Sequence, residues 1–142
     1  MLWLVPALPL LGALVNTLLN RKASRVVAGS IATLAVAASA VVSFMTLMQV
    51  HHDGPVQQTL WTWMSAGSLH VDIGFRADAL SATMMCIVTG IGALIHAYSI
   101  GYMDDEADAR SVWRFFVYLN LFIFAMLLLV MGDSFPLMFV GW

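Results

Sequence analysis

His96 is the ionisable side chain whose position points most directly to chemistry, because it lies inside a long apolar segment, Ala79–Met103. A full charge near the bilayer centre costs about 2.5 to 3.5 kcal/mol even on insertion scales, so an ionisable group within a membrane span is a functional candidate by default. An imidazole exchanges its proton near neutral pH, which suits a proton relay. The alternative is a neutral imidazole hydrogen-bonded between helices, and the sequence alone favours this structural role. Tyr98, Ser99 and Tyr102 follow His96 and could supply hydrogen bonds.

Two polar clusters outside the apolar segments contain residue types that bind metals. They are His51, His52, Asp53 and His70, and the acidic run Asp104, Asp105, Glu106 and Asp108. Imidazole and carboxylate are common zinc ligands, but the spacing of these histidines is not diagnostic, and adjacent histidines at an exposed helix end are usually solvated. A short acidic connection could attract cations, although it is usually a solvated loop. We therefore predict no metal site.

The composition is that of an integral membrane protein. Hydrophobic residues make up 61% of the chain, charged residues make up 10%, and the mean hydropathy is +0.89, whereas about a quarter of the residues of a soluble domain are charged. Lys and Arg together number six and are scattered, so the sequence offers no basic surface for nucleic acid. Cys86 is the one cysteine, which excludes a disulfide framework and a thiolate metal site.

Apolar segments predict an all-α fold with four transmembrane helices and the start of a fifth. The segments are Leu2–Leu19, Val26–Val50, Ala79–Met103, Phe115–Gly132 and Phe135–Trp142. Pro6 and Pro9 fit the first segment if they lie in its first turns or kink it. Because its positive charges follow it rather than precede it, we interpret this segment as a retained span and not as a signal peptide.

The last segment is predicted to be the beginning of a span. Asp133 or Ser134 could cap this helix, and Pro136 suits a first turn that needs no amide donor. Residues 135–142 would cover about 12 Å of a hydrocarbon core about 30 Å thick. In the same way, Asp78 is placed to cap the helix that starts at Ala79.

The second apolar segment is rich in small residues, which allow helices to approach closely in lipid, where van der Waals packing drives association. They are Ala28, Gly29, Ser30, Ala32, Ala35, Ala37, Ala38, Ser39 and Ala40. We expect this helix to pack against neighbouring helices rather than to face lipid all round.

Between helices two and three the sequence predicts a small β-hairpin at the membrane surface. Leu60–Met64 and Leu69–Phe75 alternate apolar and polar residues around the small-residue turn Ser65–Ser68. Trp61 and Trp63 fit the aromatic belt at the membrane interface. The chain thus divides into three regions: two helices in residues 1–50, a surface loop with the hairpin in 51–78, and the remaining helices in 79–142.

Orientation follows from Lys and Arg in short loops, which favour the cytoplasmic side. One group of loops carries Arg21, Lys22, Arg25, Arg110 and Arg114, whereas the hairpin side carries Arg76. We therefore predict cytoplasmic loops at residues 20–25 and 104–114, with the N-terminus and the hairpin outside. Residues 104–114 are predicted to be a short charged connection between two helices.

Three motifs carry a resemblance to a known family. FRADALSATMM begins at Phe75, LIHAYSIGYM begins at Leu94, and RFFVYLNLFIFAMLLLVMGDSFPLMFVGW runs from Arg114 to Trp142. In order and spacing they resemble the N-terminal part of subunit L of bacterial NADH:quinone oxidoreductase, the respiratory complex I. Residues 1–74 fit the same pattern more loosely. The YSIGYM and LNLF segments are typical of antiporter-like subunits, which include the large subunits of multi-subunit sodium/proton antiporters.

The resemblance implies the N-terminal portion of a longer, proton-translocating subunit of the bacterial inner membrane. In that family the tryptophan equivalent to Trp142 is followed by a glutamate that is essential to the proton path, so no catalytic residue can be assigned within these 142 residues. His96 belongs to a family motif and is the one candidate for the proton path. NADH and quinone would be used elsewhere in the complex, no cofactor is expected on this chain, and its partners would be lipid and other membrane subunits.

Two alternatives stay open at this point. One is a fragment of a multi-subunit sodium/proton antiporter, and the other is a short structural or assembly protein that binds a partner through its small-residue second helix. On any of these interpretations the chain by itself is not expected to be an enzyme.

Overall fold

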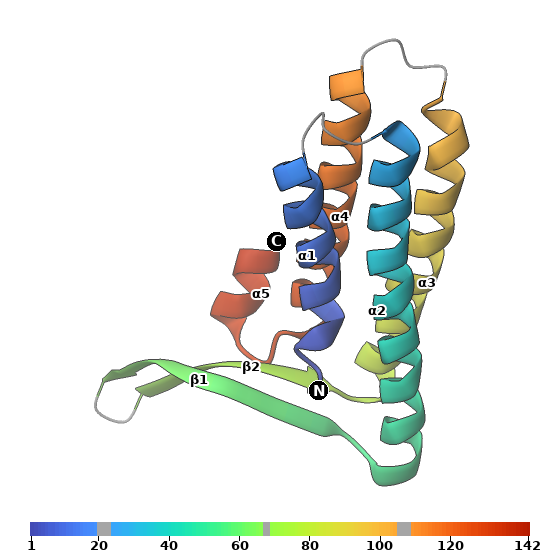
Figure 1. The fold of residues 1–142 in the computed structure, drawn as a ribbon. Helices are drawn as coiled ribbons and strands as arrows, with labels where there is room; N and C mark the ends of the chain where they lie inside the picture. Colours follow the sequence, from blue (N-terminus) through green and yellow to red (C-terminus); the bar gives the residue numbers. More distant parts are fainter. Residues whose placement is uncertain (20–23, 67–68, 105–108) are drawn as a thin grey trace.

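The computed structural model describes residues 1–19, 24–66, 69–104 and 109–142. The elements are α1 (Leu4–Leu19), α2 (Arg25–Asp53), β1 (Val56–Ala66), β2 (Leu69–Ala77), α3 (Ala79–Tyr102), α4 (Ala109–Met131) and α5 (Phe135–Gly141). Helices α1 to α4 lie side by side in alternating directions, and the hairpin crosses one end of the bundle near the N-terminus (Figure 1). We call this the hairpin end. The opposite end, where α1 and α3 finish and α2 and α4 begin, is the loop end.

Three helices in the described part of the chain are long and apolar enough to cross a membrane. They are Arg25–Asp53, Ala79–Tyr102 and Ser111–Met131. Helix α1 is apolar but has 16 residues, and α5 has seven. The helical class and the hairpin are therefore confirmed, whereas length and composition support three of the expected spans.

Two helix boundaries differ from the prediction, because an apolar run indicates which residues face lipid and not where hydrogen bonding ends. Helix α2 continues through His51 and His52 to Asp53. It ends at Gly54, which adopts a φ of 87° and donates its N–H to the Val50 carbonyl. Helix α4 begins at Ala109, so residues 109–114, predicted as part of the charged loop between two helices, form its first turns.

A proline in α1 is compensated by a side chain from α2. Pro9 has no N–H, so the Val5 carbonyl lacks its usual partner four residues later. The Ser39 hydroxyl donates to this carbonyl at 2.6 Å, and both residues are fully buried. This bond attaches α1 to α2 at a position where a backbone acceptor would otherwise be unsatisfied.

Small residues bring the helices close together, as predicted for the second segment. A methyl group built on Gly12 of α1 would lie 2.7 Å from Ala35 Cβ, and one on Gly29 of α2 would lie 2.7 Å from Ile100 Cγ1. Since real Cβ atoms do not approach so closely, these helices could not keep their spacing with larger residues at positions 12 and 29.

The hairpin is longer than predicted but is antiparallel as expected, with Val56 opposite Ala77 at its open end. Its turn residues, 67 and 68, lie outside the described residues. The segment after α4 anchors it: the Asp133 N–H donates to the Gly74 carbonyl at 3.1 Å, and Gln57 Nε2 donates to the Asp133 carboxylate. Asp133 thus supports the hairpin, while Ser134 occupies the cap position of α5 without a capping side-chain bond.

Asp78 caps α3 as predicted. Its carboxylate accepts from the Ser81 N–H at 2.8 Å and from the Ser81 hydroxyl at 2.7 Å, and its own N–H donates to the Ser81 hydroxyl. The hydrogen bond from the Ser81 backbone, followed by that from its side chain, lowers the pKa of Asp78.

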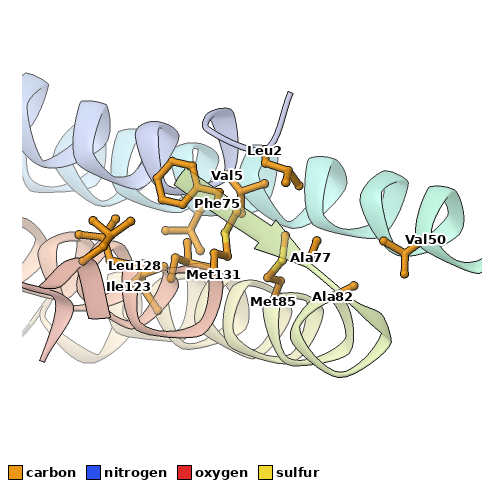
Figure 2. Close-up of a cluster of buried hydrophobic side chains, with 13 residues drawn as sticks. Leu2, Val5, Val50, Phe75, Ala77, Ala82, Met85, Ile123, Leu128 and Met131 are labelled. Atoms are coloured by element: carbon orange, nitrogen blue, oxygen red, sulfur yellow. The ribbon is translucent and has the colours of Figure 1, made fainter. Parts of the chain in front are cut away.

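A cluster of apolar side chains joins α1 to α5 and β2, and Figure 2 shows these side chains packed between the helices and the strand. Its members are Leu2, Val5, Val36, Val50, Phe75, Ala77, Ala82, Met85, Ile123, Leu127, Leu128, Met131 and Leu137. We call it the hairpin-end cluster. The hairpin-end cluster holds together the helices that carry the buried polar residues described next.

Candidate functional site

His96 is fully buried on α3 and forms a polar contact between helices. Its Nδ1 lies 2.7 Å from the Gly92 carbonyl oxygen one turn earlier, and its Nε2 lies 3.0 Å from Oδ1 of Asn120 on α4. Asn120 is also fully buried. His96 therefore occupies the position between helices that is expected of a structural histidine. Its Nε2 also contacts an amide, whose orientation depends on whether the ring is protonated.

The chemistry of these groups limits the protonation states of the pair. A carbonyl only accepts, so Nδ1 of His96 must carry a hydrogen and donate it to Gly92. If the ring is an imidazolium, Nε2 also donates, and Asn120 presents Oδ1. If the ring is neutral, Nε2 accepts, and Asn120 must turn its amide to present Nδ2. A change of charge on His96 is thus coupled to the orientation of the Asn120 amide.

Asn120 contacts α1 at a glycine. A Cβ built on Gly12 would lie 2.7 Å from Asn120 Nδ2, so the missing side chain provides the space for the amide. One turn further along α1, Asn16 is buried and donates from Nδ2 to the Ala28 carbonyl of α2 at 3.1 Å. We call Asn16, Asn120 and His96 the asparagine–histidine group.

Four buried side-chain atoms lack a hydrogen-bond partner within the described part of the chain. Two belong to the asparagine–histidine group, Asn16 Oδ1 and Asn120 Nδ2. The other two, Gln58 Oε1 and Ser134 Oγ, belong to β1 and to the start of α5. An unsatisfied polar atom among apolar helices is costly, which makes the first two notable.

The other residues considered from the sequence are not brought to this site. Tyr98 and Tyr102 are exposed and stack on each other with ring centroids 6.0 Å apart, while Ser99 donates to the Ile95 carbonyl of its own helix. His51 and His52 lie in the last turn of α2, exposed.

No metal-binding group was found among the described residues. No three His, Cys, Asp or Glu side chains within that part of the chain lie close enough to hold an ion. His70 is exposed on β2. Of the acidic run, residues 105, 106 and 108 lie outside the described residues.

Sequence reasoning missed Asn16 and Asn120, because it searched the apolar segments for ionisable side chains. Both asparagines interrupt otherwise apolar stretches, and in lipid an amide also needs a partner. That signal was available in the sequence, although it does not reveal that Asn120 and His96 contact each other.

Comparisons with known proteins agree on one family. A family profile described as "NADH-Ubiquinone oxidoreductase (complex I), chain 5 N-terminus" matches residues 63–116. The chain is 40% identical to NADH-quinone oxidoreductase subunit L of Mycobacterium tuberculosis over 143 residues, which is 99% of this chain and 22% of that protein. It is 39% identical to subunit L of Neisseria meningitidis (99% of this chain, 21% of that protein) and 37% identical to that of Escherichia coli (100% and 23%). The chain thus spans about a fifth of the length of these relatives.

Proposed function

This chain belongs to the family of complex I subunit L and chain 5, whose N-terminal region it matches, and on that premise we propose that it forms part of a membrane subunit that translocates protons while NADH reduces quinone. The observation that carries the proposal is the identity of about 40% that extends over nearly the whole chain. The relatives' names favour complex I over a sodium/proton antiporter and over a separate assembly protein.

A chimeric subunit tests this function. The region of the Escherichia coli subunit L that aligns with this chain is replaced by the chain, and everted membrane vesicles are assayed for NADH oxidation and for acidification of their interior. We expect both activities, because the aligned region covers all of this chain. A complex that assembles and oxidises NADH without acidification contradicts the proposal, and sodium-dependent proton exchange without NADH oxidation favours the antiporter.

We further propose that the chain is a multi-pass protein of the bacterial inner membrane, in which α1 to α4 span the bilayer and α5 begins a fifth span. The hydropathy of α2 to α4 and the apolar composition of α1 support this arrangement. The distribution of Lys and Arg favours a cytoplasmic loop end and an external hairpin end. Labelling of single cysteines from each side of sealed vesicles tests the orientation, and a cytoplasmic hairpin would contradict it.

Partners and cofactors follow from the same proposal. The bilayer and other membrane subunits of complex I would surround the helices of residues 1–50 and 79–142, with the loop 51–78 at the outer surface. NADH and quinone would act elsewhere in the complex. Because His96 is the one buried His, Lys, Arg, Asp or Glu among the described residues, we expect no proton flux from the chain alone in proteoliposomes.

We propose His96 as a residue that influences proton transfer, with its contact to Asn120 as support. In the chimera, His96→Gln should lower the ratio of protons translocated to NADH oxidised if this role holds. His52→Gln, an exposed histidine at the hairpin end, serves as the control. An unchanged ratio in an assembled His96→Gln complex leaves the histidine with a packing role only.

A further inference from the structure

A cavity of about 250 Å³ opens between α1 and α4 at the loop end. It is lined by Asn16, Thr17, Trp113, Arg114, Val117 and Tyr118. Thr17, Arg114 and Tyr118 are exposed and form its rim, whereas Asn16 and Trp113 are buried. A water molecule occupies about 30 Å³ in the liquid, so the cavity is large enough for several.

Asn120 does not itself line this cavity but is buried close to it along α4. Val117 lines the cavity, and Asn120 lies one turn further along α4 on the same face. Side chains on a helix lean toward its N-terminus. Helices α1 and α4 run in opposite directions (Figure 1), so Asn16 leans toward the hairpin end and Asn120 leans toward the loop end and the cavity. The two asparagines therefore lean toward each other along the contact between α1 and α4, where Asn120 Nδ2 lies beside Gly12.

We propose that this cavity is a water-binding inlet to His96, in which water bridges Asn16 Oδ1 and Asn120 Nδ2 and Asn120 links that water to the imidazole. Water is suited to this place because it both donates and accepts. With Asn120 presenting Oδ1 to an imidazolium, its Nδ2 donates to the water, which donates to Asn16. With Asn120 turned toward a neutral ring, its Oδ1 and Asn16 Oδ1 both accept from the water.

The same water thus satisfies the asparagines in both protonation states of His96 by reorienting its own two hydrogens. This arrangement requires a glycine at position 12, because a Cβ there would lie 2.7 Å from Asn120 Nδ2 and displace the amide. The inference deepens the proposed role of His96, and it assigns Asn16 and Asn120 as positioning residues. Its test measures water access and not proton translocation, so the two can fail separately.

Single cysteines in the complete subunit report water access. In a cysteine-free background, which includes Cys86→Ala, we introduce Thr17→Cys, Val117→Cys and Asn120→Cys and measure labelling by 2-aminoethyl methanethiosulfonate in membrane vesicles. The reactive species is the thiolate, which needs water, so we expect these positions to react at least about tenfold faster than lipid-facing controls.

The controls lie on the same helices at comparable depth. Leu14→Cys on α1 and Leu121→Cys on α4 are exposed to the surroundings but do not line the cavity. Ser24→Cys, exposed at the loop end, shows that the reagent reaches this side. Buried position 120 should therefore react faster than its exposed neighbour 121, which is the reverse of what simple exposure predicts.

Two results would overturn the inference. If Thr17→Cys and Val117→Cys react no faster than Leu14→Cys while Ser24→Cys reacts, the cavity is dry or covered. If Val117→Cys reacts and Asn120→Cys does not, water stops at the rim and has no connection to His96. Val117→Cys and Thr17→Cys keep both asparagines, so they remain informative even if Asn120→Cys does not accumulate.

Discussion

The hairpin-end cluster and the asparagine–histidine group occupy neighbouring levels of the same helices but are built in opposite ways. All thirteen residues of the cluster are apolar, and helices α1 to α4 and β2 all contribute to it. The asparagine–histidine group consists of three buried polar residues, and two of its atoms have no partner within the described chain. Ile123 belongs to the cluster and lies one turn from Asn120 in α4, so the change in chemistry is abrupt.

This contrast separates stability from function within one bundle. In lipid, helices gain little from burying apolar surface as such, so the cluster stabilises the bundle through close packing. Apolar side chains at the level of His96 would also stabilise the bundle by close packing, and they would carry no desolvation penalty. Buried polar groups stabilise a protein only when all their hydrogen-bond partners are present. The polar level is therefore where a function is to be sought.

We expect the largest loss of stability from truncating a buried side chain of the hairpin-end cluster. Met85→Ala should lower the free energy of unfolding by about 2 to 3 kcal/mol, at the low end for buried residues because lipid is itself apolar. Met84→Ala is the matched control, since Met84 is 39% exposed whereas Met85 is fully buried. Unfolding in mixed detergent micelles measures both variants. Equal losses would mean that the cluster is not the main support of the bundle.

Gly12→Ala is expected to cost about 1 to 2 kcal/mol by overpacking. The new methyl group would meet Ala35 Cβ, which cannot move without the backbone of α2, and the Asn120 amide. Gly90→Ala has open space around it and should be neutral or slightly stabilising, because alanine favours helix. The same unfolding assay compares them. A neutral Gly12→Ala would show that α1 and α4 are not held as closely as described.

Removing the Asp78 cap should cost about 1 kcal/mol in Asp78→Ala. Because the native pKa of Asp78 is lowered, the cap contributes fully above the unfolded pKa of about 3.9 and is lost as the pH falls through the native pKa. Asp78→Asn keeps an acceptor without a titrating group, so it should lack this acid-dependent loss. An identical acid profile for the wild type and Asp78→Asn argues against the cap as its source.

The smallest expected effect is the coupling between His96 and Asn120. A double-mutant cycle with His96→Ala and Asn120→Ala should give about 0.6 kcal/mol, which is typical of side-chain hydrogen bonds between membrane helices. Tyr98→Ala with Asn120→Ala is the control pair, since Tyr98 is exposed. Coupling as large as the Met85→Ala effect would make His96 a stabilising residue and weaken the contrast between the two levels.

The sequence alone predicted the elements better than their ends and their contacts. Apolar runs located the long helices, and the Asp78 cap followed from residue type and position. Hydropathy could not locate the end of α2 at Asp53 or the start of α4 at Ala109, because polar residues continue a helix outside the lipid. The site was predicted as His96 alone. Its partner Asn120 depends on how α3 and α4 pack, which no local pattern contains.

The bond between Ser39 and Val5 has a consequence for biogenesis. With Pro9 in place, α1 alone would carry a backbone carbonyl without a partner into hydrocarbon, where each such group costs several kcal/mol. The partner arrives only with α2, because Ser39 lies at the middle of that helix. The first two helices are therefore expected to leave the insertion machinery for the bilayer as a pair, and the serine of the second completes the backbone of the first.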